Sequence, residues 1–353
     1  MATAITTEQK AQFFRDGFIV LRDVVPRELT SRARREIHMH TVLTGMTRPY
    51  HALVRDALPN LMNKSPLASI MCEMIGPYDT PTRAFAATLN PQPAPKREVP
   101  NFGWQPHVAG WWYGQVPETS EEVDSFQIPC TWHFGTADAT EIGANHTPFF
   151  QDPACTLSTG SFTAFVGVAL NDQSEHGRGN LCFLKGAQEV VESFYQMQRD
   201  AGGVIGPEGE GWPRLSPTPD GNGVTLTNLP TYIREHFLDT AKITPDGTFW
   251  LEPTPVLLEE GDTVIAMYAC PRNGSMNLGP DPRKNVYFRL CHKRPEAGQV
   301  YSDSDHPDRG WEGEFLNYSY DLNPWSTSID YLCDHWRDWD GPKDQVAAMR
   351  GSS

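Results

Sequence analysis

One stretch, residues 261 to 290, constrains the fold of this chain more than any other. It reads GDTVIAMYACPRNGSMNLGPDPRKNVYFRL. A turn at Glu260 to Asp262 leads into β-branched and apolar residues at 263 to 269, which predict a strand. The run breaks at Pro271 to Gly274, and a second strand is predicted at Asn285 to Leu290. Two strands joined by a loop indicate a β-rich fold.

Other parts of the chain repeat this strand pattern. Period-2 or continuous apolar runs predict strands at residues 18 to 25, 84 to 89, 161 to 170 and 180 to 184. Helices are predicted toward the N-terminus, in a short capped segment after Thr6 or Thr7, at 27 to 44 and at Ser65 to Ile75. With 353 residues, 39% of them hydrophobic, the chain can bury a large core. We expect a single domain over residues 1 to 353.

The charge of the chain excludes some classes of partner. Its formal net charge is −15, and its basic residues form no run longer than the short cluster at Arg32 to Arg35. We therefore expect neither a nucleic acid nor a membrane partner. The N-terminal residues do not form a signal segment, and no stretch approaches the about 20 apolar residues of a membrane span. A cytoplasmic location is expected, with reduced thiols, since the seven cysteines are scattered and form no C-x-x-C pair.

A second informative stretch is WQPHVAGWWYG, at residues 104 to 114. Its single titratable side chain, His107, lies among four aromatic residues, namely Trp104, Trp111, Trp112 and Tyr113. In isolation the pattern favours a histidine packed among aromatic rings. The alternative is a substrate-binding surface with one acid or base.

Together the two stretches resemble the iron-site halves of the phytanoyl-CoA dioxygenase-like branch of the Fe(II)/2-oxoglutarate-dependent oxygenases. The opening FFRDGFIVLR at 13 to 22 and the turn sequence GNL at 179 to 181 add to the resemblance, which covers roughly residues 8 to 295. It implies a mainly β fold with flanking helices, a double-stranded β-helix of the jelly-roll or cupin-like barrel type.

Three segments depart from that family pattern. They are an insertion at about 115–158, a loop insertion at about 201–228 and a Trp-rich C-terminal extension at about 296–353. Long loops in compact domains commonly form lids or binding surfaces. The extension is expected to wrap the barrel or to form an oligomer interface, because buried aromatic residues contribute strongly to interfaces.

The chain departs from the family pattern at the positions of the iron ligands. The family binds iron through His-x-Asp and a later histidine, and an arginine 11 residues beyond that histidine holds 2-oxoglutarate. Here the first motif reads HVAG at 107 to 110, so Ala109 replaces the carboxylate. If Arg283 is the 2-oxoglutarate arginine, Arg272 stands where the second histidine belongs. A guanidinium offers no lone pair to a metal. The residues His107, Ala109 and Arg272 therefore cannot form the triad, and no metal or cofactor is expected.

Loss of the iron ligands predicts a different use of the same pocket. We expect His107, Arg272 and Arg283 to be catalytic, with the guanidiniums holding an anionic or carbonyl-bearing small molecule and the histidine acting as acid or base. The expected substrate-binding residues are Trp104, Trp111, Trp112, Tyr113, Asn273 and Asn277. A plainer interpretation of Arg283 pairs it with Asp281 or Asp262.

Three functions remain open from the sequence. The first is an enzyme, fitting secondary metabolism, that performs redox-neutral isomerisation or cyclisation without iron. The second is an Fe(II)/2-oxoglutarate-dependent hydroxylase or halogenase, with ligands recruited from the insertion, such as His133, Asp138 and His146. The third is a non-catalytic partner subunit of an active homologue. A homodimer, or a heterodimer with such a homologue, is compatible with these functions.

Overall fold

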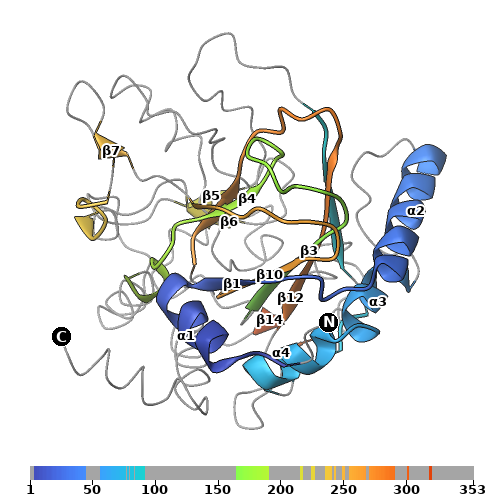
Figure 1. Cartoon of the computed structure of the whole chain (residues 1–353), viewed down its shortest axis with the longest axis horizontal. Coiled ribbons are helices and arrows are strands. Elements are labelled where there is room, and N and C mark those ends of the chain that lie inside the picture. The colour runs from blue at the N-terminus through green and yellow to red at the C-terminus, as the bar shows by residue number, and fades with distance from the viewer. Residues whose placement is uncertain are drawn as a thin grey trace.

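The computed structural model describes residues 4–44, 56–76, 78, 80–82, 84–91, 164–190, 215–217, 224–226, 235–240, 242–243, 249–250, 254–267, 270–290, 300–301 and 318–319. Most of these residues belong to two antiparallel sheets and four N-terminal helices (Figure 1). The larger sheet has the strand order β1 (Phe18–Leu21), β10 (Thr263–Met267), β3 (Ala164–Ala169), β12 (Arg283–Leu290) and β2 (Phe85–Leu89). The smaller sheet has the order β11 (Arg272–Gly274), β4 (Leu181–Phe183) and β9 (Thr254–Pro255).

The chain passes back and forth between these two sheets. Strand β3 lies in the larger sheet, β4 and β9 in the smaller, β10 in the larger, β11 in the smaller and β12 in the larger. The two sheets meet where Phe18 of β1 stacks on Phe183 of β4, with ring centroids 4.5 Å apart. This alternation is the connectivity of a double-stranded β-helix, so the predicted fold class is confirmed.

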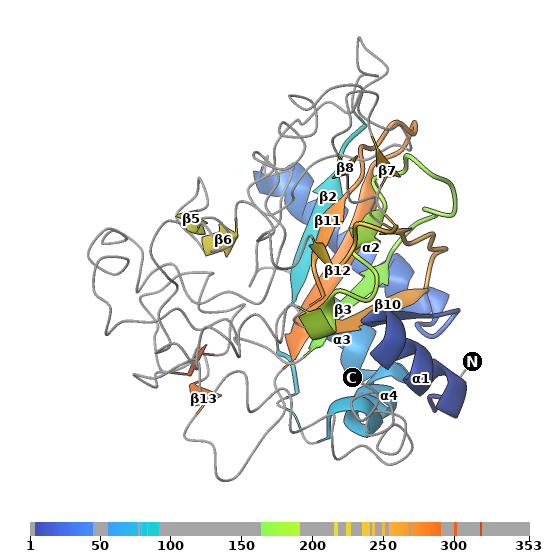
Figure 2. The same cartoon turned by 90° about the vertical axis from the view of Figure 1, so that its left-hand side faces the viewer.

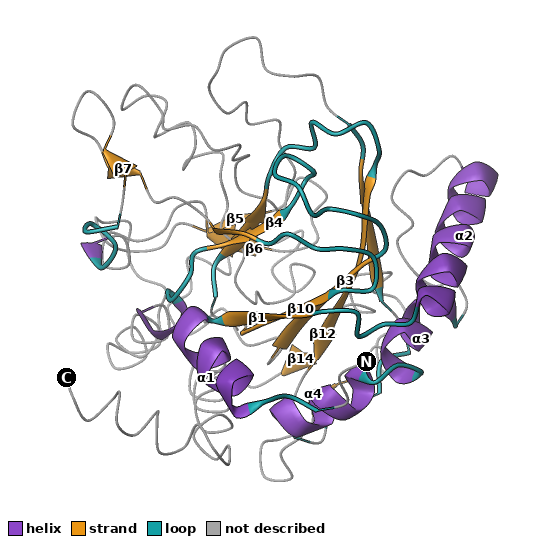
Figure 3. Ribbon diagram, viewed as in Figure 1, coloured by secondary structure: helices purple, strands orange, loops and turns teal. Residues whose placement is uncertain are grey.

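The larger sheet is buried on both faces. Successive side chains of a strand point to opposite faces. Residues that share the face of Phe18 include Phe165 and Tyr287, according to the strand registers. This is the inner face, toward the smaller sheet. The opposite, outer face carries residues such as Val166 and Phe288, which are buried in one cluster with apolar side chains of the helices. Figures 2 and 3 show these helices together on one side of the larger sheet.

The four helices are α1 (Thr7–Asp16), α2 (Arg27–Thr44), α3 (Ala57–Asn63) and α4 (Leu67–Ile75). Helix α1 begins with the predicted cap, since the Thr6 side chain accepts from the amide of Gln9 and the Gln9 side chain accepts from the amide of Thr6. Helix α2 has the predicted bounds, and α4 lies within the predicted helix at Ser65 to Ile75. Helix α3 was not predicted. Within the described residues, no helix is both long and apolar enough to cross a membrane.

Short strands form in several segments where none was predicted. The predicted break at 271 to 274 was wrong, because β11 forms there and pairs with β4. The expected loop insertion at 201–228 contains the hairpin of β5 (Leu215–Pro217) and β6 (Val224–Leu226). Further pairs are β7 (Lys242–Ile243) with β8 (Phe249–Trp250), and β13 (Val300–Tyr301) with β14 (Tyr318–Ser319) in the C-terminal extension. The insertion at 115–158 lies outside the described residues.

Candidate active site

Arg272 and Arg283 are brought to the same part of the molecule by the two facing sheets. Arg272 begins β11 in the smaller sheet, opposite Phe183 of β4. Arg283 begins β12 in the larger sheet, opposite Leu89 of β2. Both side chains are buried, with 3% and 6% of their surface exposed. The 11-residue spacing therefore carries the chain from one sheet to the other and buries a guanidinium on each.

A stacked aromatic pair links the two arginines. Phe165 of β3 and Tyr287 of β12 have ring centroids 5.0 Å apart and planes 28° from parallel. The guanidinium carbon of Arg272 lies 4.4 Å from the centre of the Phe165 ring, a cation–π contact. On the Tyr287 side, Nη1 of Arg283 lies 3.3 Å from the hydroxyl oxygen. One guanidinium thus lies over the Phe165 ring and the other lies at the Tyr287 hydroxyl.

Arg283 is held by neutral oxygen atoms. Its Nη1 donates to the backbone carbonyl of Gly179 at 3.1 Å and to the Tyr287 hydroxyl. Its Nε is buried and has no hydrogen-bond partner among the described residues. The predicted ion pairs of Arg283 are not formed, since Asp262 pairs with Arg22 at 2.6 Å and the described bonds of Arg283 do not reach Asp281. Arg283 therefore retains a buried donor that can bind an acceptor.

Gly179 allows the close approach to Arg283. Its φ is +72°, a left-handed conformation that L side chains rarely adopt. A Cβ at this position would lie 2.8 Å from Cδ2 of Leu89 and 3.4 Å from Cβ of Arg283. Another residue here would strain the backbone and push aside the end of the Leu89 side chain.

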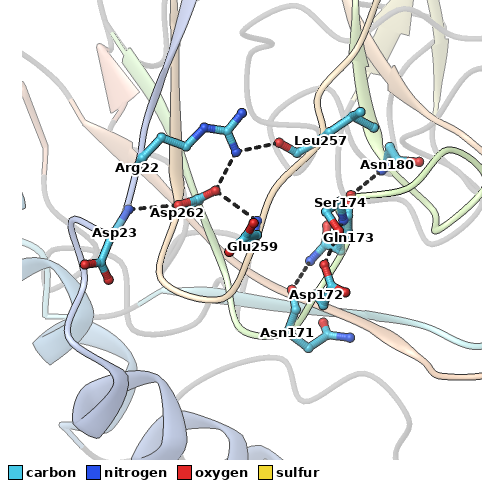
Figure 4. Close-up of polar contacts among 10 residues, drawn as sticks. All are labelled: Arg22, Asp23, Asn171, Asp172, Gln173, Ser174, Asn180, Leu257, Glu259 and Asp262. Atoms are coloured by element: carbon cyan, nitrogen blue, oxygen red, sulfur yellow. Dashed lines mark hydrogen bonds and ion pairs between the residues drawn. The ribbon is translucent and has the colours of Figure 1, made fainter.

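A chain of buried amides continues from Tyr287. Nδ2 of Asn285 donates to the Tyr287 hydroxyl at 2.9 Å, and Nε2 of Gln173 donates to Oδ1 of Asn285 at 2.6 Å. The backbone carbonyl of Gln173 accepts from Nδ2 of Asn180 at 2.8 Å (Figure 4). Because Arg283, Asn285 and Tyr287 alternate along β12, they share the inner face. This network fixes the position of the Tyr287 hydroxyl beside Arg283.

Asn277 has a structural place next to this network. Its Nδ2 donates to the carbonyls of Leu89 and Asp281, at 2.8 and 2.9 Å, and its Oδ1 accepts from the amide of Gly279. The Asn277 amide thus holds the loop before β12 against the end of β2. Of Asn273, the structure describes the backbone, which pairs with Cys182 in the smaller sheet.

Burial changes the acid–base properties of the interior. Loss of solvent lowers the pKa of Arg272 to about 10, which leaves its guanidinium charged at neutral pH. Burial also raises the pKa of Cys182 and of Cys270 above the ordinary value, and both are free thiols. Neither cysteine is ionised near pH 7, so neither has the thiolate that a nucleophile requires.

Among the described residues, position 272 does not supply the iron ligand that the family resemblance implies. The family resemblance assigns a histidine ligand to position 272, and there a buried guanidinium lies over an aromatic ring. Among the described residues, no three His, Cys, Asp or Glu side chains are grouped so that they could hold a metal ion. His107 and Ala109 lie outside the described residues, as do Trp104, Trp111, Trp112 and Tyr113 and the insertion residues His133, Asp138 and His146.

The sequence prediction missed Phe165, Asn285, Tyr287 and Gln173. A signal for two of them was present, because Asn285 and Tyr287 follow Arg283 at the period of a strand. The predicted strand began at Asn285, two residues late, so this relation to Arg283 was not recognised. Phe165 is placed beside Tyr287 by the pairing of β3 with β12. No pattern in the sequence around Phe165 indicates this position.

Comparison with known proteins finds similar solved structures. Neither a protein-family model nor a curated protein sequence matches the chain. SnoK, a non-heme α-ketoglutarate-dependent carbocyclase from nogalamycin biosynthesis, is 12% identical with a TM-score of 0.44, over 90% of this chain and 95% of that chain. HygX from Streptomyces hygroscopicus, with nickel and 2-oxoglutarate bound, is 12% identical with a TM-score of 0.41, over 82% and 90%.

A third similar structure is the epimerase SnoN in complex with Fe3+, α-ketoglutarate and nogalamycin RO. It is 14% identical with a TM-score of 0.41, over 83% of this chain and 91% of that chain. The chain is thus similar, over most of its length, to these three solved structures. At these identities the similarity concerns the fold.

Proposed function

We propose that this protein is a small-molecule enzyme, fitting secondary metabolism, that uses the barrel interior of the oxygenase scaffold for redox-neutral chemistry without iron. The observation that carries the proposal is the buried Arg272, which stands at a ligand position and contacts Phe165. A positive charge there repels a metal cation: two unit charges about 4 Å apart repel by about 4 kcal/mol at an effective dielectric near 20, and a divalent ion feels about twice that.

The proposed reaction is an isomerisation or a cyclisation. In such a reaction one proton leaves the substrate and one returns, and no electrons are lost, so no oxidant is required. Arg272 and Arg283 would hold an anionic or carbonyl-bearing substrate and stabilise negative charge on its oxygen as the proton leaves. In this proposal His107 removes and returns the proton.

The remaining predicted residues have supporting roles in this proposal. Trp104, Trp111, Trp112 and Tyr113 would form an apolar surface for the substrate. Asn277, whose amide is occupied by backbone groups, would shape the site through the loop before β12 rather than by direct contact. No cofactor is part of the proposal, and Fe(II) and 2-oxoglutarate belong to the alternative oxygenase function.

Metal content tests the proposal. The protein is purified, incubated anaerobically with Fe(II) and 2-oxoglutarate, desalted and subjected to elemental analysis. We expect far less than one iron per chain. The matched control is the double variant A109D/R272H, which restores both altered ligand positions and should retain more iron than the unchanged chain. About one iron per unchanged chain would reject the proposal in favour of a hydroxylase or halogenase.

Substitution of the proposed catalytic residues is the second test, applied once turnover of a substrate is observed. H107A should reduce turnover by about 100-fold or more, the contribution typical of a positioned acid–base group. R283A should reduce it by about 100-fold or more, as expected for a donor that stabilises developing negative charge. Unchanged turnover in both variants would exclude this use of the pocket.

A further inference from the structure

Helix α2 carries two straight rows of residues on opposite sides, and Figure 1 shows the helix along one side of the molecule. One row is buried and consists of Thr30, Ala33, Ile37 and His40. The other row, which we call the outer seam, is exposed and consists of Glu28, Arg32, Arg35, Met39 and Val42. Its steps alternate between four and three residues. This spacing is the one by which a helix presents a continuous row to a second helix.

The C-terminal part of the outer seam is apolar. Met39 is 60% exposed and Val42 67%, and the adjoining Leu43 is 79% exposed. The described residues include only two other exposed large hydrophobic residues, Leu238 and Leu278, so most of this exposed apolar surface is on one short part of α2. Single exposed apolar residues are ordinary, whereas a contiguous group indicates a surface that another molecule covers.

Arg35 adjoins this apolar group and carries an unmatched charge. It is exposed and forms no ion pair within the described part of the chain. Its neighbours one turn away on α2 include Arg32 and His38 but no acidic residue, and Arg32 itself pairs with Glu36 at 3.4 Å. A guanidinium at the edge of an apolar contact favours a partner that places an acidic group there and disfavours one that places a basic group there.

Two other occupants fit the outer seam less well. In a parallel pair of α2 helices from two copies of the chain, Arg35 would face its counterpart. In an antiparallel pair that matches the two apolar ends, Arg35 would lie opposite a position beyond Thr44, where the partner helix ends. A membrane surface suits a helix with a wide apolar face and a basic polar face, whereas this apolar row is narrow and shares the helix with Glu28 and Glu36.

We propose that the outer seam binds an acidic amphipathic helix of another protein. The apolar row of that helix packs on Met39, Val42 and Leu43, and one of its acidic side chains lies beside Arg35. This interaction does not depend on the proposed function, because α2 covers the outer face of the larger sheet and the candidate site is on the inner face (Figure 3). Partner binding and chemistry therefore use opposite faces of one sheet.

Two synthetic peptides of about three heptads test the proposal. Both have leucine at the a and d positions, and the e and g positions carry glutamate in the acidic peptide and lysine in the basic one. These like charges oppose pairing of a peptide with itself. Binding is measured by fluorescence anisotropy at an ionic strength of about 0.15 M, where charges beyond about 8 Å are screened. We expect the acidic peptide to bind about threefold or more tightly than the basic one, against the overall preference of a chain with net charge −15.

Two variants assign the binding to the outer seam. M39Q/V42Q/L43Q removes apolar surface without changing the charge, and it should weaken binding of the acidic peptide by at least about tenfold. R35E replaces the attraction by a repulsion and should reverse the order of the two peptides. The altered side chains are exposed, so both variants should fold, and circular dichroism confirms this.

L238Q and R27E are the matched controls. Leu238 is 45% exposed outside α2, and Arg27 is exposed on α2 but outside the outer seam. Both controls should bind the two peptides as the unchanged chain does. A reversed order in R35E is a change of preference, which partial unfolding of a variant does not produce.

The proposal is overturned if the unchanged chain binds neither peptide or binds the basic one as tightly as the acidic one. Sedimentation velocity of the chain alone, and its flotation with vesicles of phosphatidylcholine and phosphatidylserine in equal amounts, test the other occupants. A dimer that M39Q/V42Q/L43Q dissociates would assign the outer seam to a second copy, and vesicle binding lost in that variant would assign it to a membrane. Either result would also overturn the proposal.

Discussion

Asp262 and Arg22 form an ion pair in which the two partners differ sharply in exposure. The carboxylate side chain is 3% exposed and the guanidinium side chain 61%, and Nη1 lies 2.6 Å from Oδ2. The same carboxylate accepts from the amides of Asp23 and Glu259, at 2.8 and 2.9 Å (Figure 4). It therefore fastens the turn before β10 to the end of β1, across 240 positions of sequence.

We predict unequal effects from removing the two partners of this pair. D262A leaves two amides without their acceptor and should lower the free energy of unfolding by about 2–4 kcal/mol. R22M removes a solvent-exposed partner and should cost about 0–1 kcal/mol. Urea denaturation followed by circular dichroism measures both. Equal losses in the two variants would contradict the prediction.

Glu260 is predicted to add stability that depends on pH. Burial raises the pKa of its carboxyl, but hydrogen bonds from Thr30 and Arg34 lower it more, so the pKa lies below the ordinary value. A carboxyl whose pKa falls on folding stabilises the protein above its unfolded pKa, and this contribution disappears as the pH falls through the folded pKa.

E260Q should therefore lower the free energy of unfolding by about 0.5–1.5 kcal/mol near pH 7, and the difference from the unchanged protein should shrink in acid. Urea denaturation between pH 3 and pH 8 measures the difference. E36Q serves as the control, because Glu36 pairs with an exposed arginine on α2. A loss that stays constant over this pH range would show that charge is not its cause.

Gly261 is predicted to tolerate substitution far less well than Gly177, although both have a positive φ, +91° and +74°. A Cβ on Gly261 would lie 2.6 Å from the carbonyl oxygen of Val25, a backbone atom that cannot easily withdraw. The nearest atom to a Cβ on Gly177 is a side-chain carbon of Leu278, at 3.7 Å.

G177A should lower the free energy of unfolding by about 1–2 kcal/mol, the cost of the left-handed conformation alone. G261A adds a backbone clash and should exceed that loss by at least about 1 kcal/mol. The midpoints of urea denaturation give the comparison, and a G261A variant as stable as G177A would be the contrary result.

Tyr287 is predicted to support stability through its oxygen atom. Y287F keeps the ring on Phe165 but removes the acceptor that Arg283 and Asn285 share, at 3.3 and 2.9 Å. The loss should be about 1–3 kcal/mol, because the Asn285 amide loses a buried acceptor and Nη1 of Arg283 loses one of its two acceptors. The control is Y78F, since the half-buried Tyr78 hydroxyl donates one bond to the Ala68 carbonyl. An equal or smaller loss in Y287F would contradict the prediction.

The fold was largely predictable, because its main strands coincide with apolar runs that can be recognised from the local sequence. The apolar runs at 18–25, 161–170 and 263–269 contain β1, β3 and β10, whose burial makes them almost continuously apolar. Strand β11 was taken for a loop, because Pro271 precedes it, Gly274 is its last residue and only three residues pair with β4. Short strands of this kind form through tertiary pairing rather than through their own propensity.

The candidate site was predictable in part. The 11-residue spacing identified Arg272 and Arg283, and the structure buries both against the same aromatic pair. The partners of these arginines could not be predicted in the same way. Phe165 lies more than 100 residues away and meets Arg272 through the facing of the two sheets, whereas Gly179 meets Arg283 through a carbonyl that no residue type reveals.

The central position of β3 in the larger sheet affects when its amide protons can exchange with solvent. Strand β3 has hydrogen-bonded neighbours on both sides, β10 and β12, and all six of its residues are buried. Its amide protons should therefore exchange with deuterium only when the whole domain unfolds, later than those of the edge strands β1 and β2. Exchange at residues 164 to 169 consequently reports the global free energy of unfolding, without denaturant, from within the strand that carries Phe165.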